Sequence, residues 1–275
     1  MKVSLLRFAL PVICLLTAQL QGQQPAAAPA AAPAPAYYQS MTLVKTLPGK
    51  GSDWVKLVNE TTKKVAQMRA DSGEIVSWTL LRAVMPAGQE ARADYIMSTI
   101  YQGVPPAPWS GTEMADAWKK AGVTMTTEEA SAKRNANSTL VSMEMWRINA
   151  RIGAPAKGHY VMLNHMKVKD ANGYRDFANS TSKPIAEEKV KGGDMSGWIW
   201  ATRVVPSGTD QAYAAYTADM YPTWAATFGG RSGQAVFEKV FPGKNGQESM
   251  AAGTKVRDLA KRELWVIQER VTKSK

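Results

Sequence analysis

The sequence repeats itself. When it is shifted by 120 positions, Trp54–Tyr101 aligns with Tyr174–Tyr221 without a gap. Ten of the 48 aligned pairs are identical, where composition alone would give about three. These pairs are Asn59/Asn179, Thr61/Thr181, Lys63/Lys183, Ala66/Ala186, Gly73/Gly193, Trp78/Trp198, Val84/Val204, Pro86/Pro206, Gly88/Gly208 and Tyr101/Tyr221. The chain is therefore expected to fold as two copies of one structural unit, 37–155 and 156–275.

Both copies predict the same order of elements. Alternating apolar residues indicate strands at 41–47 and 160–168, and helices with an apolar face follow them, each ending at a glycine, Gly73 or Gly193. Strands at 77–84 and 197–205 stop at a Pro-x-Gly turn and lead to strands at 95–101 and 216–221. Helical sequence and a last strand close each copy, with Glu144 matching Glu263 at a shift of 119. The order is βαββαβ, twice.

This order is that of the ferredoxin-like unit, an α+β unit whose helices cover one face of a four-stranded antiparallel sheet. The strands carry large side chains on both alternating sets, so the second face of each sheet must also be covered. We therefore expect the two sheets to pack open face to open face as an intramolecular α/β barrel. Such packing is compatible with either a cleft or a filled core between them. The sequence predicts a monomer with an internal pseudo-dimer.

The repeated pattern of an aromatic-faced helix, a glycine, Ser77–Trp78 or Gly197–Trp198, Pro-x-Gly and a strand ending in tyrosine resembles the dimeric α/β-barrel superfamily. That group includes monooxygenase-like, stress-responsive barrel and NIPSNAP-like domains. The resemblance covers nearly all of residues 37–275. It implies the barrel fold, and it leaves the reaction open because members include enzymes with and without haem.

The N-terminus has the pattern of an export signal. Lys2 and Arg7 precede an apolar run from Phe8 to Ala18, which is too short to span a bilayer. We predict a signal peptide over 1–22, with a lipoprotein anchor at Cys14 as the alternative. The Pro/Ala-rich stretch 23–36 is predicted to be a spacer. The mature chain is then a soluble periplasmic or secreted bacterial protein without an integral membrane segment.

The formal charge of +11 falls to +9 when Lys2 and Arg7 are removed with the signal. The remaining lysines and arginines are scattered, which favours a solvated basic surface over a nucleic-acid site. No nucleic-acid partner is expected. The only cysteine also leaves with the signal, so disulfides and thiol chemistry are excluded from the mature chain.

Two kinds of titratable residue are candidates for chemistry in the cleft. Glu144 and Glu263 occupy matched positions in the closing strands, and a raised pKa on one of them would support proton transfer. The favoured interpretation of this pair is instead a strand-edge salt bridge that the duplication preserved. His165 lies in the first strand of the second copy, where the shift of 120 places Lys45, and could act as an acid, a base or a ligand. No second ligand lies at metal-binding spacing, so no metal site is predicted.

Most tryptophans occupy repeat-equivalent positions, as a duplicated core requires. Trp109, Trp200 and Trp224 break the symmetry. A directional pocket must differ from the repeat, so ligand-binding candidates are Trp200, Arg82, Arg203 and Asp219, with His165, Glu144 and Glu263.

The sequence is compatible with two functions. The favoured one is an exported protein that binds a small apolar or aromatic ligand between its sheets, or serves as an interaction module, with no cofactor. The alternative is a cofactor-independent oxygenase or a haem-handling enzyme of the barrel type.

Overall fold

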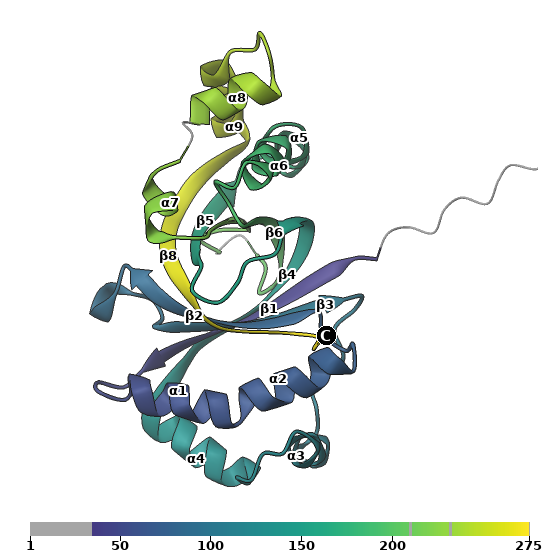
Figure 1. The fold of residues 1–275 in the computed structure, drawn as a ribbon, viewed down its shortest axis with the longest axis vertical. Coiled ribbons are helices and arrows are strands. Elements are labelled where there is room, and N and C mark those ends of the chain that lie inside the picture. The colour runs from purple at the N-terminus through teal and green to yellow at the C-terminus, as the bar shows by residue number, and fades with distance from the viewer. Residues whose placement is uncertain (1–34, 209–210, 231–232, 275) are drawn as a thin grey trace, which may run out of the picture. The chain divides into compact units, whose positions relative to one another are not determined.

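Both halves of the chain fold in the predicted order (Figure 1). The computed structural model describes residues 35–208, 211–230 and 233–274. The predicted signal peptide and all but the last two residues of the predicted spacer lie outside this part. The N-terminal unit contains β1 (Tyr37–Thr46), α1 (Gly51–Glu60), α2 (Thr62–Asp71), β2 (Ser77–Met85), β3 (Tyr95–Gln102), α3 (Gly111–Lys120), α4 (Thr127–Asn137) and β4 (Ser138–Gly153). The C-terminal unit contains β5 (Tyr160–Val168), α5 (Ala171–Phe177), α6 (Lys183–Lys191), β6 (Gly197–Val205), β7 (Ala215–Tyr221), α7 (Trp224–Phe228), α8 (Gly233–Val240), α9 (Gly246–Val256) and β8 (Arg257–Thr272).

The eight strands form one closed antiparallel barrel. Each unit contributes four strands in the ferredoxin-like order, β4-β1-β3-β2 and β8-β5-β7-β6. The edges of the two sheets are hydrogen-bonded to each other through β2 with β8 and β4 with β6. The predicted intramolecular α/β barrel is confirmed, and its two sheets are joined edge to edge into one continuous wall.

The strand ladders correct one repeat equivalence. Thr42 pairs with Met97 in the N-terminal unit, and Asn164 pairs with Thr217 in the C-terminal unit. The first strands are therefore related by a shift of 122, because the connection that follows β5 is shorter than the one that follows β1. The structural counterpart of His165 is consequently Leu43, and the equivalence with Lys45 is wrong.

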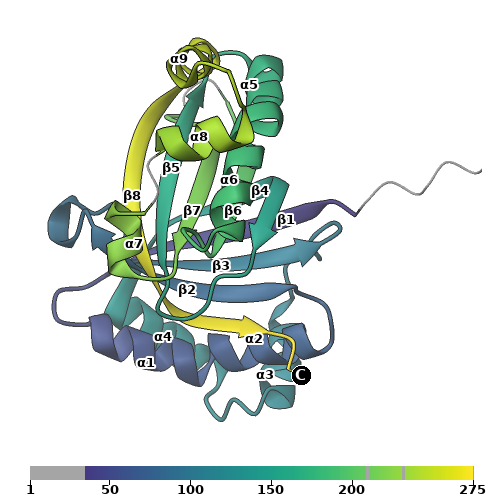
Figure 2. The same ribbon diagram turned by 45° about the horizontal axis from the view of Figure 1, so that its top comes forward.

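Alternate residues along each strand divide the core into two layers. One set fills the barrel interior, with Trp146 and Trp265 less than 3% exposed at its centre. The other set lies under the helices. Figures 1 and 2 show α1–α4 on one side of the barrel and α5, α6, α8 and α9 on the other. Trp54 and Trp78 pack in the outer layer of the N-terminal unit, and Tyr174 and Trp198 in that of the C-terminal unit.

The first long helix of each unit is interrupted at an equivalent place. In the C-terminal unit, a π-helical turn, Ala178–Ser182, separates α5 from α6, and Pro184 lies in the first turn of α6. This is the division that a proline inside the predicted helix requires. In the N-terminal unit, the break falls at Thr61, whose hydroxyl donates to the Leu57 carbonyl at 2.7 Å.

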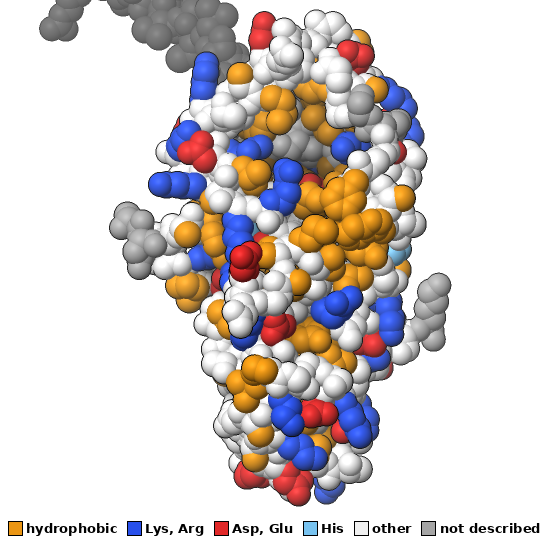
Figure 3. All heavy atoms as spheres, turned by 90° about the vertical axis from the view of Figure 1, so that its left-hand side faces the viewer, with side chains coloured by type: hydrophobic (Ala, Val, Ile, Leu, Met, Phe, Trp, Pro, Cys, Tyr) orange, Lys and Arg blue, Asp and Glu red, His pale blue; other side chains and the backbone are white. Residues whose placement is uncertain are grey.

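On the face shown in Figure 3, basic side chains are scattered among acidic and apolar ones and do not gather in one patch. None of the helices in the described part of the chain combines the length and the hydrophobicity needed to cross a bilayer.

Candidate functional site

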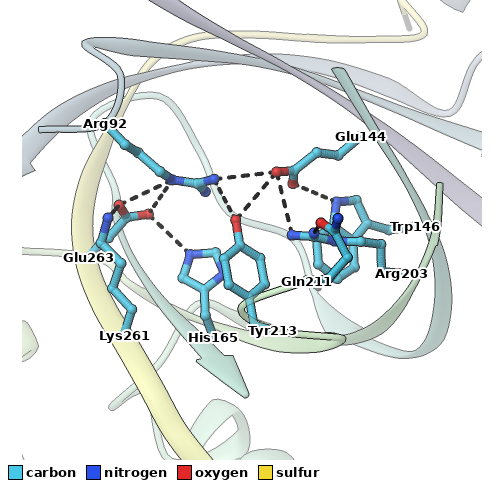
Figure 4. A network of polar contacts seen from close by, with 9 residues as sticks. All are labelled: Arg92, Glu144, Trp146, His165, Arg203, Gln211, Tyr213, Lys261 and Glu263. Carbon is cyan, nitrogen blue, oxygen red and sulfur yellow. Dashed lines mark hydrogen bonds and ion pairs between the residues drawn. The ribbon is translucent and has the colours of Figure 1, made fainter. Parts of the chain in front are cut away.

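Four of the predicted residues, Glu144, His165, Arg203 and Glu263, belong to one polar group around Arg92 at one end of the barrel (Figure 4). Glu144 and Glu263 point inward from β4 and β8. Arg92, in the β2–β3 loop, lies between them, with Nε 3.2 Å from one oxygen of Glu263 and Nη1 3.3 Å from Glu144. The Nε2 atom of His165 lies 3.0 Å from the other Glu263 oxygen. The two glutamates are therefore joined through an arginine.

Further contacts surround Glu144. Arg203 Nη2 lies 3.5 Å from its carboxylate, and the Trp146 indole donates to it at 3.1 Å. The Tyr213 hydroxyl donates to Glu144 at 3.3 Å and accepts a 2.5 Å hydrogen bond from Arg92. The Arg203 guanidinium also lies over the Tyr213 ring, 4.1 Å from its centre. We call this group the end network: Arg92, Glu144, His165, Arg203, Tyr213, Lys261 and Glu263.

The end network holds Glu263 in its charged form. Burial alone would raise its pKa, but the hydrogen bond from His165, the charge of Arg92 and the hydrogen bond from Lys261 at 2.6 Å together lower the pKa to about 2. For Arg92, burial opposes the charge, yet its acidic neighbours raise its pKa further. The expectation of a raised pKa is therefore wrong for Glu263, because three cationic or hydrogen-bonding partners outweigh burial.

Burial lowers the pKa of His165 despite its hydrogen bond to Glu263, so the ring is neutral at neutral pH. An ionised carboxylate only accepts hydrogen bonds, and Nε2 of His165 therefore carries the proton. Its Nδ1 atom is buried without a partner and lies outside any group of metal-ligating side chains in the described residues.

These residues are closed to a substrate. His165, Glu144 and Glu263 are 1%, 6% and 2% exposed, and each carboxylate is already bound by cations. Removing one partner of such a buried group would leave a charge uncompensated. The end network therefore cross-links β4, β5 and β8 to the loops that cover this end of the barrel.

The barrel interior is almost filled. Aliphatic side chains and the two central tryptophans leave a cavity of about 40 Å³ near the opposite end, enough for about three water molecules. The prediction that an aromatic ligand binds between the sheets is wrong. The interior strand residues are large and interdigitate, and the space that they leave is too small for a ring.

A larger cavity lies between the outer face of the C-terminal sheet and its helices. This C-terminal cavity has a volume of about 360 Å³, within the range of small-ligand sites. Asn164 forms the centre of its floor, donating to Thr217 at 3.1 Å and to Asp219 at 2.9 Å and accepting from Arg262 at 2.7 Å. Three neighbouring strands thus carry one continuous row of hydrogen bonds. Aromatic and apolar side chains form the walls: Tyr174, Phe177, Ile185, Met195, Trp198 and Tyr221.

The charges of the C-terminal cavity are mostly positive. Lys189, Arg257 and Arg262 line it, with Asp219 as the acidic residue. None of these cations forms an ion pair within the described residues, and Arg257 Nε is buried without a partner. Burial raises the pKa of Asp219, while Asn164, Lys189 and Arg262 oppose this shift. The cavity therefore offers a net positive environment next to an apolar wall.

The N-terminal unit has an equivalent cavity of about 330 Å³, here called the N-terminal cavity. Its wall includes Trp54, the counterpart of Tyr174. The charged positions differ: Thr99, Ser138 and Met143 occupy the places of Asp219, Arg257 and Arg262. The polar floor is thus specific to the C-terminal unit.

The remaining predicted residues are separated from the end network. Asp219 is on the floor of the C-terminal cavity. Trp200 is buried in the outer layer, where its ring centre lies 5.8 Å from that of Tyr174. Arg82 is exposed on β2. The grouping of Trp200, Arg82 and Asp219 with the glutamates is therefore wrong, since strand alternation sends their side chains to the outer face. Trp109 stacks on Arg69 at 4.8 Å, and Trp224 is 44% exposed on α7.

Sequence reasoning missed Arg92, Tyr213, Arg257 and Arg262. The first two lie in polar loops, where nothing in the pattern predicts which side chain turns inward. The last two carry a signal in the repeat, because each replaces an uncharged residue at a shift of 119.

The superfamily that the sequence resembles includes haem enzymes. The residues of this protein, however, do not fit a haem group. Protein haem iron is held by histidine, cysteine or tyrosinate, or by methionine together with histidine. The C-terminal cavity has no histidine or cysteine, and burial raises the pKa of Tyr174 to about 12, so that its hydroxyl stays protonated. Outside this cavity, Nε2 of His165 is hydrogen-bonded to Glu263, and Nδ1 of His159 lies 2.9 Å from the Ser196 hydroxyl.

No protein-family model matches the sequence, and no curated protein matches it. Solved structures do match. A candidate monooxygenase from Lactobacillus acidophilus is 10% identical with a TM-score of 0.51, over 88% of this chain and 97% of that one. A candidate monooxygenase from Fusobacterium nucleatum is also 10% identical with a TM-score of 0.51, over 88% and 95%. These likenesses concern the fold alone, a barrel built from two ferredoxin-like sheets.

Proposed function

We propose that the protein is an exported module that binds a small organic anion with an aromatic or apolar body in the C-terminal cavity. The observation that carries this proposal is the change of charge between the two equivalent cavities. A cavity that only fills space needs no cations without an ionic partner, and the partial burial of Lys189 and Arg257 costs free energy. Export rests on the N-terminal sequence pattern.

The lining suits such a ligand in two parts. The apolar wall around Tyr174 and Phe177 would contact a ring or an alkyl chain. Arg257, Arg262 and Lys189 would bind the anionic group, since guanidinium groups recognise carboxylates through paired hydrogen bonds. The Tyr174 hydroxyl, which is buried without a partner, is a further donor.

Calorimetric titration with three related probes tests the proposal: 3-phenylpropionate, its neutral amide, and the corresponding amine. We expect the carboxylate to bind, the amide to bind at least tenfold more weakly, and the amine not to bind. Equal binding of acid and amide, or preference for the amine, would overturn the assignment of an anion.

A swap variant locates the site. Replacing Asp219, Arg257 and Arg262 by their N-terminal counterparts, as Asp219→Thr, Arg257→Ser and Arg262→Met, should abolish binding of 3-phenylpropionate. The matched control is Arg134→Met, which removes the cation that lines the N-terminal cavity and should leave affinity unchanged. Loss of binding in the control alone would assign the ligand to the other cavity. Unchanged near-ultraviolet circular dichroism shows that each variant is folded.

A further inference from the structure

Two arginines face the small interior cavity at the barrel end opposite the end network. Arg151 on β4 and Arg270 on β8 are matched at the repeat shift of 119 and both line that cavity. Arg270 is half-buried, with Nη1 3.4 Å from the Thr79 hydroxyl. The pseudo-twofold symmetry of the barrel thus brings two equal charges together at one opening.

No carboxylate of the described residues neutralises this pair. Neither arginine forms an ion pair, and the adjacent Glu269 is held on the other face of β8 by Lys63 and Lys157, each at 2.8 Å. Burial together with the charge of Arg151 lowers the pKa of Arg270. Burial and the charge of Arg270 lower the pKa of His159, which adds no negative charge.

The space behind the arginines is apolar in character. Its polar side chains already satisfy one another, because Gln39 donates to Ser98 at 2.6 Å and accepts from Tyr216. Met41, Leu163 and Ile199 form much of the remaining wall. A volume of about 40 Å³ accommodates about three heavy atoms if each occupies a water-sized space. An occupant must therefore combine an anionic head with a very short apolar tail.

We propose that this end of the barrel binds a short-chain carboxylate of three or four carbons, with its carboxylate between Arg151 and Arg270 and its tail in the interior cavity. Paired guanidinium groups match a carboxylate, and a bulkier tetrahedral anion such as phosphate would put charged oxygens against the aliphatic wall. This site is independent of the C-terminal cavity.

Titration with butyrate, butyramide and phosphate at constant ionic strength tests the proposal, followed by calorimetry and by NMR of the isoleucine and leucine methyl groups. We expect butyrate to bind and to shift the methyl signals of Leu163 and Ile199, while butyramide and phosphate do neither. Equal responses to all three solutes, or butyrate binding without a change at those methyl groups, would overturn it.

Substitution of each arginine tests whether its charge binds the carboxylate. Arg151→Gln and Arg270→Gln should each weaken butyrate binding at least tenfold. Arg147→Gln is the matched control, since Arg147 is exposed on the same strand outside the barrel and should leave the affinity as it is. The swap variant of the C-terminal cavity should also bind butyrate normally. If it loses butyrate while Arg270→Gln retains it, the carboxylate occupies the other cavity and the proposal fails.

Discussion

The N-terminal and C-terminal cavities share their walls and differ in their floors. Both lie between the outer face of a four-stranded sheet and the helices that cover it, and both are walled by a helical aromatic residue, Trp54 or Tyr174. The N-terminal cavity has Met97 and Met143 where the C-terminal one has Thr217 and Arg262. The comparison indicates that packing fixes the walls of both copies, whereas the floor is free to acquire charge in one of them.

The largest expected effect concerns the shared wall. Trp54 is 1% exposed and its ring lies 4.6 Å from that of Tyr95, so Trp54→Ala should lower the free energy of unfolding by about 4 kcal/mol. Affinity for 3-phenylpropionate should not change. Urea denaturation and calorimetry measure the two quantities, and a loss of affinity in the folded variant would remove the distinction between the cavities.

His165 and its counterpart Leu43 differ in that only the histidine can take up a proton. A buried neutral histidine must take up a proton on unfolding in acid, so its contribution to stability is complete above its unfolded pKa of about 6.5 and declines below it. Glu263, lowered to about 2, loses its contribution only below about 4.5. His165→Leu should therefore flatten the fall in unfolding midpoint between pH 6.5 and 4.5, measured by thermal melts. An unchanged slope would contradict the neutral buried ring.

A smaller effect is expected at the floor of the C-terminal cavity. Burial raises the pKa of Asp219, so the folded state binds its proton more tightly, and stability from this group falls as the pH rises above about 3.8. Asp219→Asn should raise the melting midpoint at pH 7 and have no effect below pH 3.8. The reciprocal change, Thr99→Asp, should lower the midpoint. A lower midpoint for Asp219→Asn at pH 7 would show that the charge is stabilised by its cations.

The smallest effect is expected at Arg82, which sequence reasoning had placed in the binding site. Its exposed side chain makes no hydrogen bond or ion pair within the described residues. Arg82→Ala should therefore change the free energy of unfolding by less than about 0.5 kcal/mol and leave both ligand affinities as they are. A tenfold loss of affinity for 3-phenylpropionate or butyrate would show that Arg82 contributes to one of the two binding sites.

The repeat predicted the fold because duplication preserves alternation, turns and glycines, as at Gly73 and Gly193, which both have positive φ. It predicted the pairing of Glu144 and Glu263 for the same reason. It could not predict that Arg92 would lie between them, since a loop conformation depends on contacts distant in sequence. The two-residue difference after β1 also misplaced the counterpart of His165, because the sequence alignment began beyond that connection.

The seams between β2 and β8 and between β4 and β6 have a kinetic and thermodynamic consequence. If the two halves were separate chains, closing the barrel would be a bimolecular step whose extent fell with dilution. In one chain, the second half is always present at the high local concentration set by its connection to the first. Barrel closure is then a first-order process that tolerates any dilution, and each half can change its cavity without having to remain complementary to a copy of itself.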